Sequence, residues 1–233
     1  MSPYHLRRHP RARRVKLRVE RDGVVVVTAP KRIRRREIDG FVASQQAWID
    51  DVRERLSRQR SQRDPAICGL RPTRIELPAV GETWRVDYGG KDGRIQSNSS
   101  AATVYLSHRD ADPVIAGRLQ NWLKGRARRK LAPWTDALAR EHGFDFARLS
   151  FRNQKSRWGS CSSNGNLSLN AKLLFCSPGA CRYVLLHELV HLEHPDHSPR
   201  FWARVAELCP DYRQHMRELK HVWNRLPDWV TVT

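Results

Sequence analysis

Four of the chain's ten histidines fall within eleven residues, at His187, His191, His194 and His197. The first two frame the run H-E-L-V-H. On a helix, side chains four residues apart project from one face, so both imidazoles can bind one tetrahedral metal ion, typically zinc. Glu188 follows the first of these histidines and can reach a water molecule at the metal, where it would act as general base. The pattern predicts a hydrolytic zinc site.

A catalytic zinc ion needs a third protein ligand and one open position. His197 follows His187 by ten residues, the spacing of the zinc enzymes with H-E-x-x-H-x-x-G-x-x-H. A proline and an aspartate before His197 can end the helix in place of that glycine. We predict His197 as the third ligand. His194, Glu207 and a closed structural site with four ligands are the alternatives.

Hydrolysis of a carbonyl compound develops an oxyanion, which needs a cation or a hydrogen-bond donor. Arg157, Tyr212 and the zinc ion itself are the candidates. Arg157 lies in the run K-S-R-W-G-S-C, residues 155–161. This run either forms a structural hairpin or lies beside the metal-binding helix and binds an extended substrate as an added strand. Both interpretations stay open at this point.

The elements that must position these residues follow from turn and capping signals. Ser-Pro pairs at 177–178 and 198–199 are typical helix starts, and Gly143 is a typical helix end. Pro133 is expected to kink or split the long helix in which it falls. We expect helices over residues 112–143, 177–194, 198–208 and 210–223, with strands over 148–151 and 166–169.

The N-terminal part alternates β-rich runs with turn residues. Runs at 15–20 and 24–29 flank an Asp-Gly turn, which indicates a hairpin. Apolar residues at helical spacing over 38–56 predict one amphipathic helix, and residues 73–106 predict a small antiparallel meander. We therefore expect an α+β fold with two lobes: an N-terminal lobe of antiparallel strands and a helix over 1–111, and a zincin-like catalytic lobe over 112–233.

Charge is concentrated at the N-terminus. The chain has 43 Lys and Arg against 24 Asp and Glu, a net charge of +19. Residues 1–36 carry +11, whereas residues 178–233 carry zero. One interpretation is a surface for nucleic acid or another polyanion. The other is a solvated face in an arginine-rich composition, with 35 Arg and 8 Lys.

The composition excludes some classes of protein. Mean hydropathy is −0.67, and no window approaches the ~18 apolar residues of a membrane span. Eight Trp, six Phe and five Tyr argue against disorder. The first twenty residues contain no apolar signal segment, and the five cysteines form no C-x-x-C pair. We expect a cytoplasmic protein with reduced thiols and no membrane association.

Several motifs together resemble the YgjP-like metallopeptidases, which are zincin-like and similar in their core to the SprT-like proteases. The resemblance extends over about residues 11–222 and departs from the family pattern at Val80 and Trp84. Its motifs are R-x-x-K-S-R-W-G-S-C-S at 152–162, L-S-L-N at 167–170, Y-V-L-L-H-E-L-V-H-L at 183–192, H-S-x-x-F-W at 197–202 and P-x-Y at 210–212.

The resemblance implies a zinc site with His187, His191 and His197 as ligands and Glu188 as catalytic acid/base. It also implies that the R-W-G-S-C loop packs near that site. We predict a zinc-dependent metallohydrolase, most simply a metallopeptidase acting on peptides or proteins. Two alternatives are a nucleoside-triphosphate pyrophosphatase, a role proposed within the family, and a nucleic-acid-binding module with a structural zinc. A protease recruited to DNA would combine the first and the last.

Overall fold

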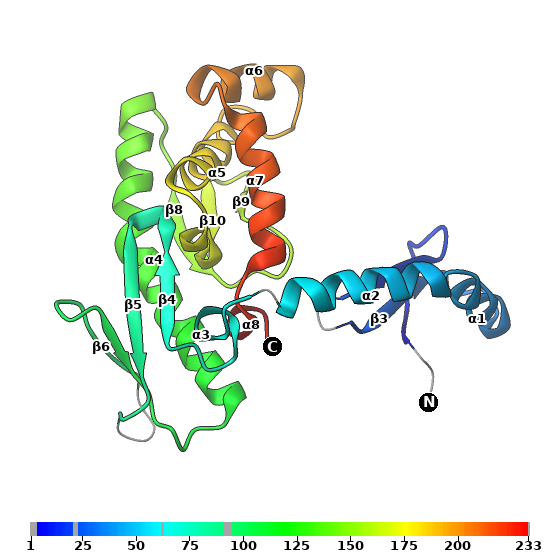
Figure 1. The fold of residues 1–233 in the computed structure, drawn as a ribbon. Coiled ribbons are helices and arrows are strands. Elements are labelled where there is room, and N and C mark those ends of the chain that lie inside the picture. The colour runs from blue at the N-terminus through cyan, green and yellow to red at the C-terminus, as the bar shows by residue number, and fades with distance from the viewer. Residues whose placement is uncertain (1–3, 21–22, 62, 91–94, 233) are drawn as a thin grey trace. The chain divides into compact units, whose positions relative to one another are not determined.

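The computed structural model describes residues 4–20, 23–61, 63–90 and 95–232. It is a mixed α+β structure with two compact units, Met1–Arg63 and Asp64–Thr233 (Figure 1). This division differs from the expected lobe boundary after residue 111. The reason is packing, because Ile75, Trp84 and Val104 share one hydrophobic core with the helices that follow them.

The first unit contains a three-stranded sheet of order β1-β3-β2 and two helices. Its elements are β1 (His5–Arg8), β2 (Lys16–Val19), β3 (Val25–Ala29), α1 (Arg35–Ser44) and α2 (Gln46–Ser61). The expected hairpin forms between β2 and β3, although Asp22 of its turn lies outside the described residues. β1 adds a parallel strand that the sequence did not predict. The single expected helix is two helices that meet at Gln45.

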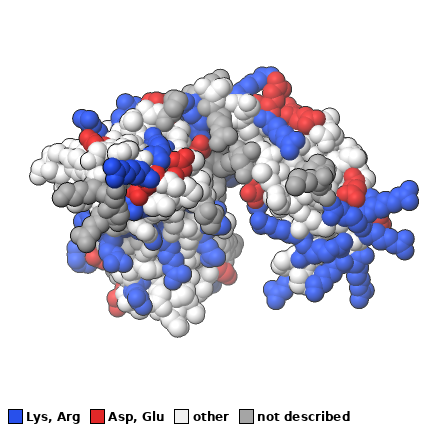
Figure 2. Space-filling model, turned by 90° about the horizontal axis from the view of Figure 1, so that it is seen from below, with Lys and Arg blue, Asp and Glu red and all other residues white. Residues whose placement is uncertain are grey.

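This unit has a small hydrophobic core and a basic outer surface. The core joins the sheet to the helices through Val27, Ala29, Ile38 and Ile49. Outside, Lys and Arg side chains gather on the strands and the loops (Figure 2). The N-terminal charge of the sequence is therefore carried by the solvent-facing side of a folded unit.

The second unit starts with a four-stranded sheet of order β4-β5-β7-β6. Its elements are α3 (Pro65–Cys68), β4 (Arg74–Leu77), η1 (Pro78–Val80), β5 (Glu82–Asp87), β6 (Gln96–Asn98) and β7 (Thr103–Tyr105). The predicted antiparallel meander is wrong in one pairing, since β5 and β7 run parallel. The cause is the strand order: β6 takes the edge, and β7 inserts between β6 and β5.

The long helix α4 (Asp112–His142) runs through Pro133 without interruption. Pro113 occupies its first turn, and Gly143 ends it in a left-handed conformation, as expected. Of the predicted kink or split at Pro133, the split is wrong, because the helix is continuous. Leu131 and Leu138, on either side of the proline, are both buried in the core. Their burial offsets the hydrogen bond that a proline removes.

A second sheet and a group of helices complete the unit. The sheet has the order β8-β10-β9, with β8 parallel and β9 antiparallel to β10. Strands β8 (Arg148–Arg152) and β10 (Asn166–Asn170) match the prediction, and β9 (Gly159–Cys161) lies in the run 155–161, which was left open as a hairpin or as a strand beside the metal-binding helix. The remaining elements are η2 (Ala171–Phe175), α5 (Pro178–Val190), α6 (Pro199–Leu208), α7 (Tyr212–Arg225) and α8 (Asp228–Thr231).

Helix α5 lies at the centre of this arrangement. It packs against α4, α6 and α7 and against strands β9 and β10 (Figure 1). Its core-facing residues Leu185, Leu186, Leu189 and Val190 are fully buried, as the sequence predicted. Among the described residues, no helix combines the length and the apolar character that crossing a lipid bilayer requires.

Candidate metal centre

Helix α5 is anchored at its first turn. The Ser177 side chain accepts a hydrogen bond from the Ala180 amide at 3.2 Å. Glu218 of α7 in turn accepts from the Ser177 amide at 3.0 Å and from its hydroxyl at 2.9 Å. The helix ends at Val190 and not at the predicted His194. Its C-terminal end therefore carries the H-E-L-V-H residues on a firmly placed backbone.

Three imidazoles converge at that end. His187, His191 and His197 each offer a ring nitrogen, and these three atoms lie within 4.8 Å of one another. The Nε2 atoms of His187 and His197 are 3.2 Å apart. Such a spacing suits three donors around one ion, and the sequence-based prediction of this grouping matches the geometry.

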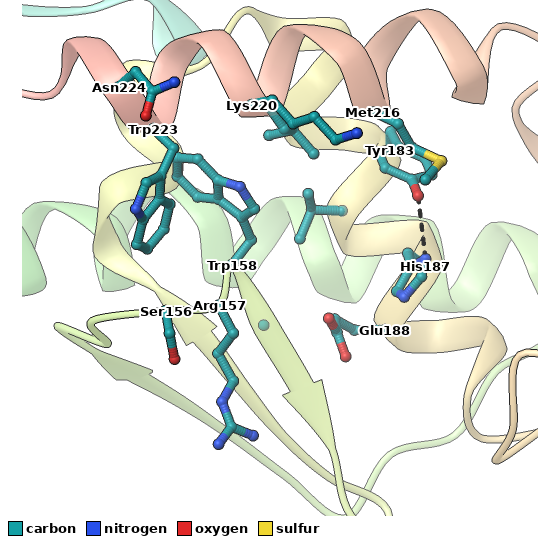
Figure 3. Close-up of a pocket in the computed structure, with 13 residues that line it drawn as sticks. Ser156, Arg157, Trp158, Tyr183, His187, Glu188, Met216, Lys220, Trp223 and Asn224 are labelled. Carbon is teal, nitrogen blue, oxygen red and sulfur yellow. Dashed lines mark hydrogen bonds between the residues drawn. The ribbon is translucent and has the colours of Figure 1, made fainter. Parts of the chain in front are cut away.

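The imidazoles of His187 and His191 each use Nδ1, the ring nitrogen that faces away from the cluster, in a hydrogen-bond contact. Nδ1 of His187 lies 3.3 Å from the Tyr183 hydroxyl (Figure 3), and Nδ1 of His191 lies 3.1 Å from the His194 carbonyl oxygen. A carbonyl can only accept, so His191 carries its proton on Nδ1 when neutral. Its Nε2 lone pair is then free for a metal ion. Outer hydrogen bonds of this kind fix the orientation and tautomer of metal-binding histidines.

His197 arrives from the turn before α6. Asp196 accepts a hydrogen bond from the Ser198 amide at 3.2 Å, which shapes this turn. Phe201, on the first turns of α6, is fully buried and contacts all three imidazoles, with ring centroids 4.9 Å from His187, 4.5 Å from His191 and 4.8 Å from His197. One aromatic side chain thus sets the positions of all three rings.

Burial favours the neutral form of two of the imidazoles, His187 and His191. It lowers the pKa of His187 to about 3, and the neighbouring His191 and His197 lower it further. The pKa of His191 is lowered too, mainly by burial. Neutral imidazoles are the form that binds metal ions. Three nitrogen donors with room for a further ligand fit a divalent cation of the zinc type.

The alternative third ligands lie elsewhere. His194 contributes its backbone carbonyl, as described above, and its ring is not part of the three-histidine group. Glu207 pairs with Arg204 at 3.0 Å, and its side chain is 66% exposed. Among the described residues, the metal-type cluster therefore consists of the three histidines.

Glu188 lies beside this cluster in a confined space. It is 5% exposed, and Gly159 of β9 faces it so closely that a Cβ added at Gly159 would lie 2.5 Å from its Oε1. Burial raises the pKa of Glu188 to about 8, and the positive charge of Arg157 opposes this rise. A divalent cation in the histidine cluster would favour the carboxylate form.

Comparison with known families decides the identity. A family model described as a YgjP-like metallopeptidase domain matches residues 13–222. The chain belongs to the YgjP-like family. No match was found among curated proteins. The family description makes the protein a metal-dependent hydrolase and favours a peptide or protein substrate, and it gives no support to nucleotide or nucleic-acid partners.

In this YgjP-like protein, the two expected oxyanion stabilisers occupy different places. Arg157 is exposed at the rim of a cavity that also contains Glu188. In Figure 3 its guanidinium points away from Trp158 and Trp223. Tyr212 stacks on Trp202 at 5.5 Å, and its hydroxyl accepts from Nε of Arg213 at 3.1 Å.

Three site residues escaped the sequence analysis. Tyr183 precedes His187 by four residues, so helical spacing alone could have placed its hydroxyl near the imidazole. Phe201 was part of a recognised motif without an assigned role. Gly159 lies in the R-W-G-S-C run, which packs against the metal helix as the family resemblance implied. Its close approach to Glu188 could not be read from spacing, because β9 and α5 are distant in sequence.

Proposed function

We propose that this YgjP-like protein is a zinc peptidase in which His187, His191 and His197 hold the ion and Glu188 is the general base. One observation carries the proposal. Three ring nitrogens lie within 4.8 Å of one another, and the buried carboxyl group of Glu188 follows the first of these histidines on α5. This zincin-like combination of three ligands, an open position and a neighbouring acid/base is what hydrolysis of an amide requires.

His187, His191 and His197 would hold the zinc ion, which would supply Lewis-acid activation of the scissile carbonyl and of the attacking water. Glu188 takes the proton from the attacking water and delivers it to the leaving amine. Arg157 and Tyr212 are the proposed donors to the developing oxyanion. The Glu188 carboxylate occupies the space where a side chain at position 159 would lie. The backbone of Gly159 thereby keeps the carboxylate in place beside the cluster.

Strand β9 is proposed to bind the substrate backbone. It is one of the two edge strands of the β8-β10-β9 sheet and packs against α5. An extended peptide can add to such an edge through main-chain hydrogen bonds. The peptide would then pass Glu188, because Gly159 belongs to this strand.

We also propose a reducing compartment, such as the cytoplasm, as the place of action. The structure contains five free cysteines, of which Cys176, Cys181 and Cys209 are buried. Burial raises the pKa of each of these three thiols. Neutral, buried thiols of this kind suit a reducing environment.

Metal content tests the ligand assignment. Elemental mass spectrometry on protein purified without chelators should find about one zinc per wild-type chain and per His194→Ala chain. His197→Ala should lose most of it. The His194 variant is the matched control, since it removes a neighbouring imidazole outside the cluster. Zinc that is absent from the wild type, or equally present in both variants, contradicts the assignment.

Activity tests the reaction. Zinc-loaded wild type should release new amino termini from a mixed peptide substrate, whereas Glu188→Gln should retain zinc and lose this activity. The same preparations are assayed for pyrophosphate release from nucleoside triphosphates. Pyrophosphate release without peptide cleavage would replace the peptidase proposal by the nucleotide alternative.

A further inference from the structure

A cavity of about 650 Å³ opens directly beside the candidate metal centre. It lies between the segment Ser156–Gly159 and helix α7, and both His187 and Glu188 form part of its wall (Figure 3). Its volume is within the range of about 300–1,000 Å³ that is typical of pockets for small ligands. The cavity is therefore large enough for a complete amino-acid side chain and begins at the reacting groups.

The walls of the cavity are mainly apolar and aromatic. The apolar contributors come from three elements: Trp158, Val184, Met216, Leu219 and Trp223. The two tryptophans pack edge to face with their ring centroids 4.7 Å apart. A third aromatic ring can join such a pair favourably, and a methionine such as Met216 adapts its shape to rings of different size.

Lys172 packs against Trp223 in the aromatic wall of the cavity. The Lys172 ammonium lies 5.3 Å from the centre of the Trp223 ring, and the same group donates to the Gln154 carbonyl at 2.9 Å. Lys172 is only 4% exposed. A buried cation on one ring face and Trp158 against it fix the orientation of Trp223. The wall is thus formed before any ligand enters, which lowers the cost of binding.

The charge at the rim is positive. Lys220 and Arg157 are exposed residues of the lining, and among the described lining residues Glu188 is the only acid. A lysine or arginine side chain that entered would meet two like charges. The cavity therefore discriminates against basic occupants as well as against small ones.

We propose, building on the peptidase function above, that this cavity is the subsite for the substrate side chain adjacent to the scissile bond. It selects large uncharged side chains, above all aromatic ones. The position of His187 and Glu188 in its wall carries this assignment, because an occupant must be attached to the backbone next to the attacked carbonyl. Trp158 and Trp223 determine the size preference, and Lys220 contributes the charge preference.

Cut-site mapping on a peptide library tests the proposal. Wild-type enzyme should cut mainly where Phe, Tyr, Trp or Leu occupies one fixed position beside the bond, at least about tenfold above Ala. Trp223→Ala should reduce this preference about tenfold. Lys220→Glu should raise cleavage beside Lys and Arg, relative to Phe, by about tenfold. Arg217→Glu makes the same charge change on α7 outside the lining and should leave the profile unchanged.

A binding measurement separates this proposal from the peptidase proposal. Saturation-transfer NMR on Glu188→Gln protein compares N-acetylphenylalanine amide with the alanine and lysine amides. The phenylalanine amide should bind at least about tenfold better than either, and the difference should shrink in the Lys220→Glu variant for the lysine amide. Absence of peptide cleavage by wild type contradicts the peptidase function alone. A flat cut-site profile, or equal binding of the three amides, overturns the subsite.

Discussion

Two poorly exposed carboxyl groups of the second unit lie in opposite surroundings. At the start of β5, Glu82 accepts from Nε of Arg126 at 2.6 Å and from the Trp84 indole at 2.9 Å, and Lys130 lies 2.8 Å away. These partners outweigh burial and lower its pKa to about 2. Glu188 faces imidazoles and Gly159, and burial raises its pKa to about 8.

The difference shows how one residue type serves structure in one region and chemistry in another. Around Glu82, cations stabilise a fixed negative charge that ties β5 to α4. Around Glu188, the cation that lowers its pKa is Arg157 at the exposed rim, so the group can exchange a proton. Perturbed carboxyl groups without a fixed cationic partner are typical of catalytic sites.

The largest expected effect is the loss of peptide hydrolysis when Glu188 is replaced, which distinguishes this residue from Glu82. Glu188→Gln keeps the shape of the side chain and removes its basicity, so peptide hydrolysis should fall by about 10³-fold. The free energy of unfolding should change by less than about 1 kcal/mol, because the amide occupies the same space. Steady-state kinetics and urea unfolding measure the two quantities. A strongly destabilised but active variant would assign Glu188 a structural role instead.

The next effect acts on the position of the same carboxyl group. Gly159→Ala places a methyl group within 2.5–2.7 Å of the Glu188 side chain, so that side chain must shift. Displacement of a catalytic group by about 1 Å can reduce the rate about 100-fold. We expect that loss in kcat with zinc content unchanged. Gly165→Ala, at the next glycine of the same hairpin, is a control for damage to the sheet, and the comparison fails if both variants lose activity equally.

Removal of the other carboxylate should act on stability. Glu82→Gln leaves Arg126, which is 8% exposed, without its anionic partner. After allowance for solvent screening, we expect a loss of about 2 kcal/mol in the free energy of unfolding, a roughly 30-fold change in the folding equilibrium. Hydrolysis per folded molecule should be unchanged. Chemical denaturation monitored beside activity checks both, and a stable but inactive variant would be the contrary result.

The contribution of Glu82 should also depend on pH. Its pKa is about 2 in the folded protein and 4.5 as the unperturbed value, so its stabilisation is fully present above pH 4.5. It is lost as the pH falls from about 4.5 to about 2. The stability difference between wild type and Glu82→Gln should therefore shrink over this interval. Urea unfolding at pH 7, 4 and 2.5 measures it, and a difference that stays constant with pH would disprove the linkage.

The smallest expected effect concerns the hydrogen bond behind the metal ligand. Tyr183→Phe removes the hydroxyl that lies 3.3 Å from Nδ1 of His187. Loss of such an outer partner reduces metal affinity by about tenfold. Competition with a zinc-binding dye gives this affinity directly. Tyr212→Phe, on a ring that stacks beside Tyr183, is the matched control for zinc affinity and should leave it unchanged.

Local signals gave correct predictions at several places where the deciding contacts are close in sequence. Three such predictions match the structure: the grouping of His187 with His197 ten residues later, the start of α6 at a Ser-Pro pair, and the end of α4 at Gly143. Each depends on a turn, a cap or one helical face. The family resemblance was confirmed as well, because its motifs are long and occur in order.

Non-local packing explains what the sequence could not supply. The parallel pairing of β5 with β7 depends on where β6 is placed, and no local pattern encodes it. The continuity of α4 through Pro133 depends on core contacts on both sides. The fit of Gly159 against Glu188 joins segments almost thirty residues apart. In each case, the deciding contact is made with residues that are distant in the sequence, so no local pattern predicts it.

The placement of His197 outside α5 has a consequence for the chain itself. A cation bound to His187 and His197 together would act as a cross-link between α5 and the turn before α6, across a sequence separation of ten residues. Closing so short a loop costs little chain entropy, because its ends already meet in the folded protein. Loss of the cation would release this loop without unfolding the core. Backbone amides of residues 192–198 would then exchange with solvent faster, while those of α5 would remain protected.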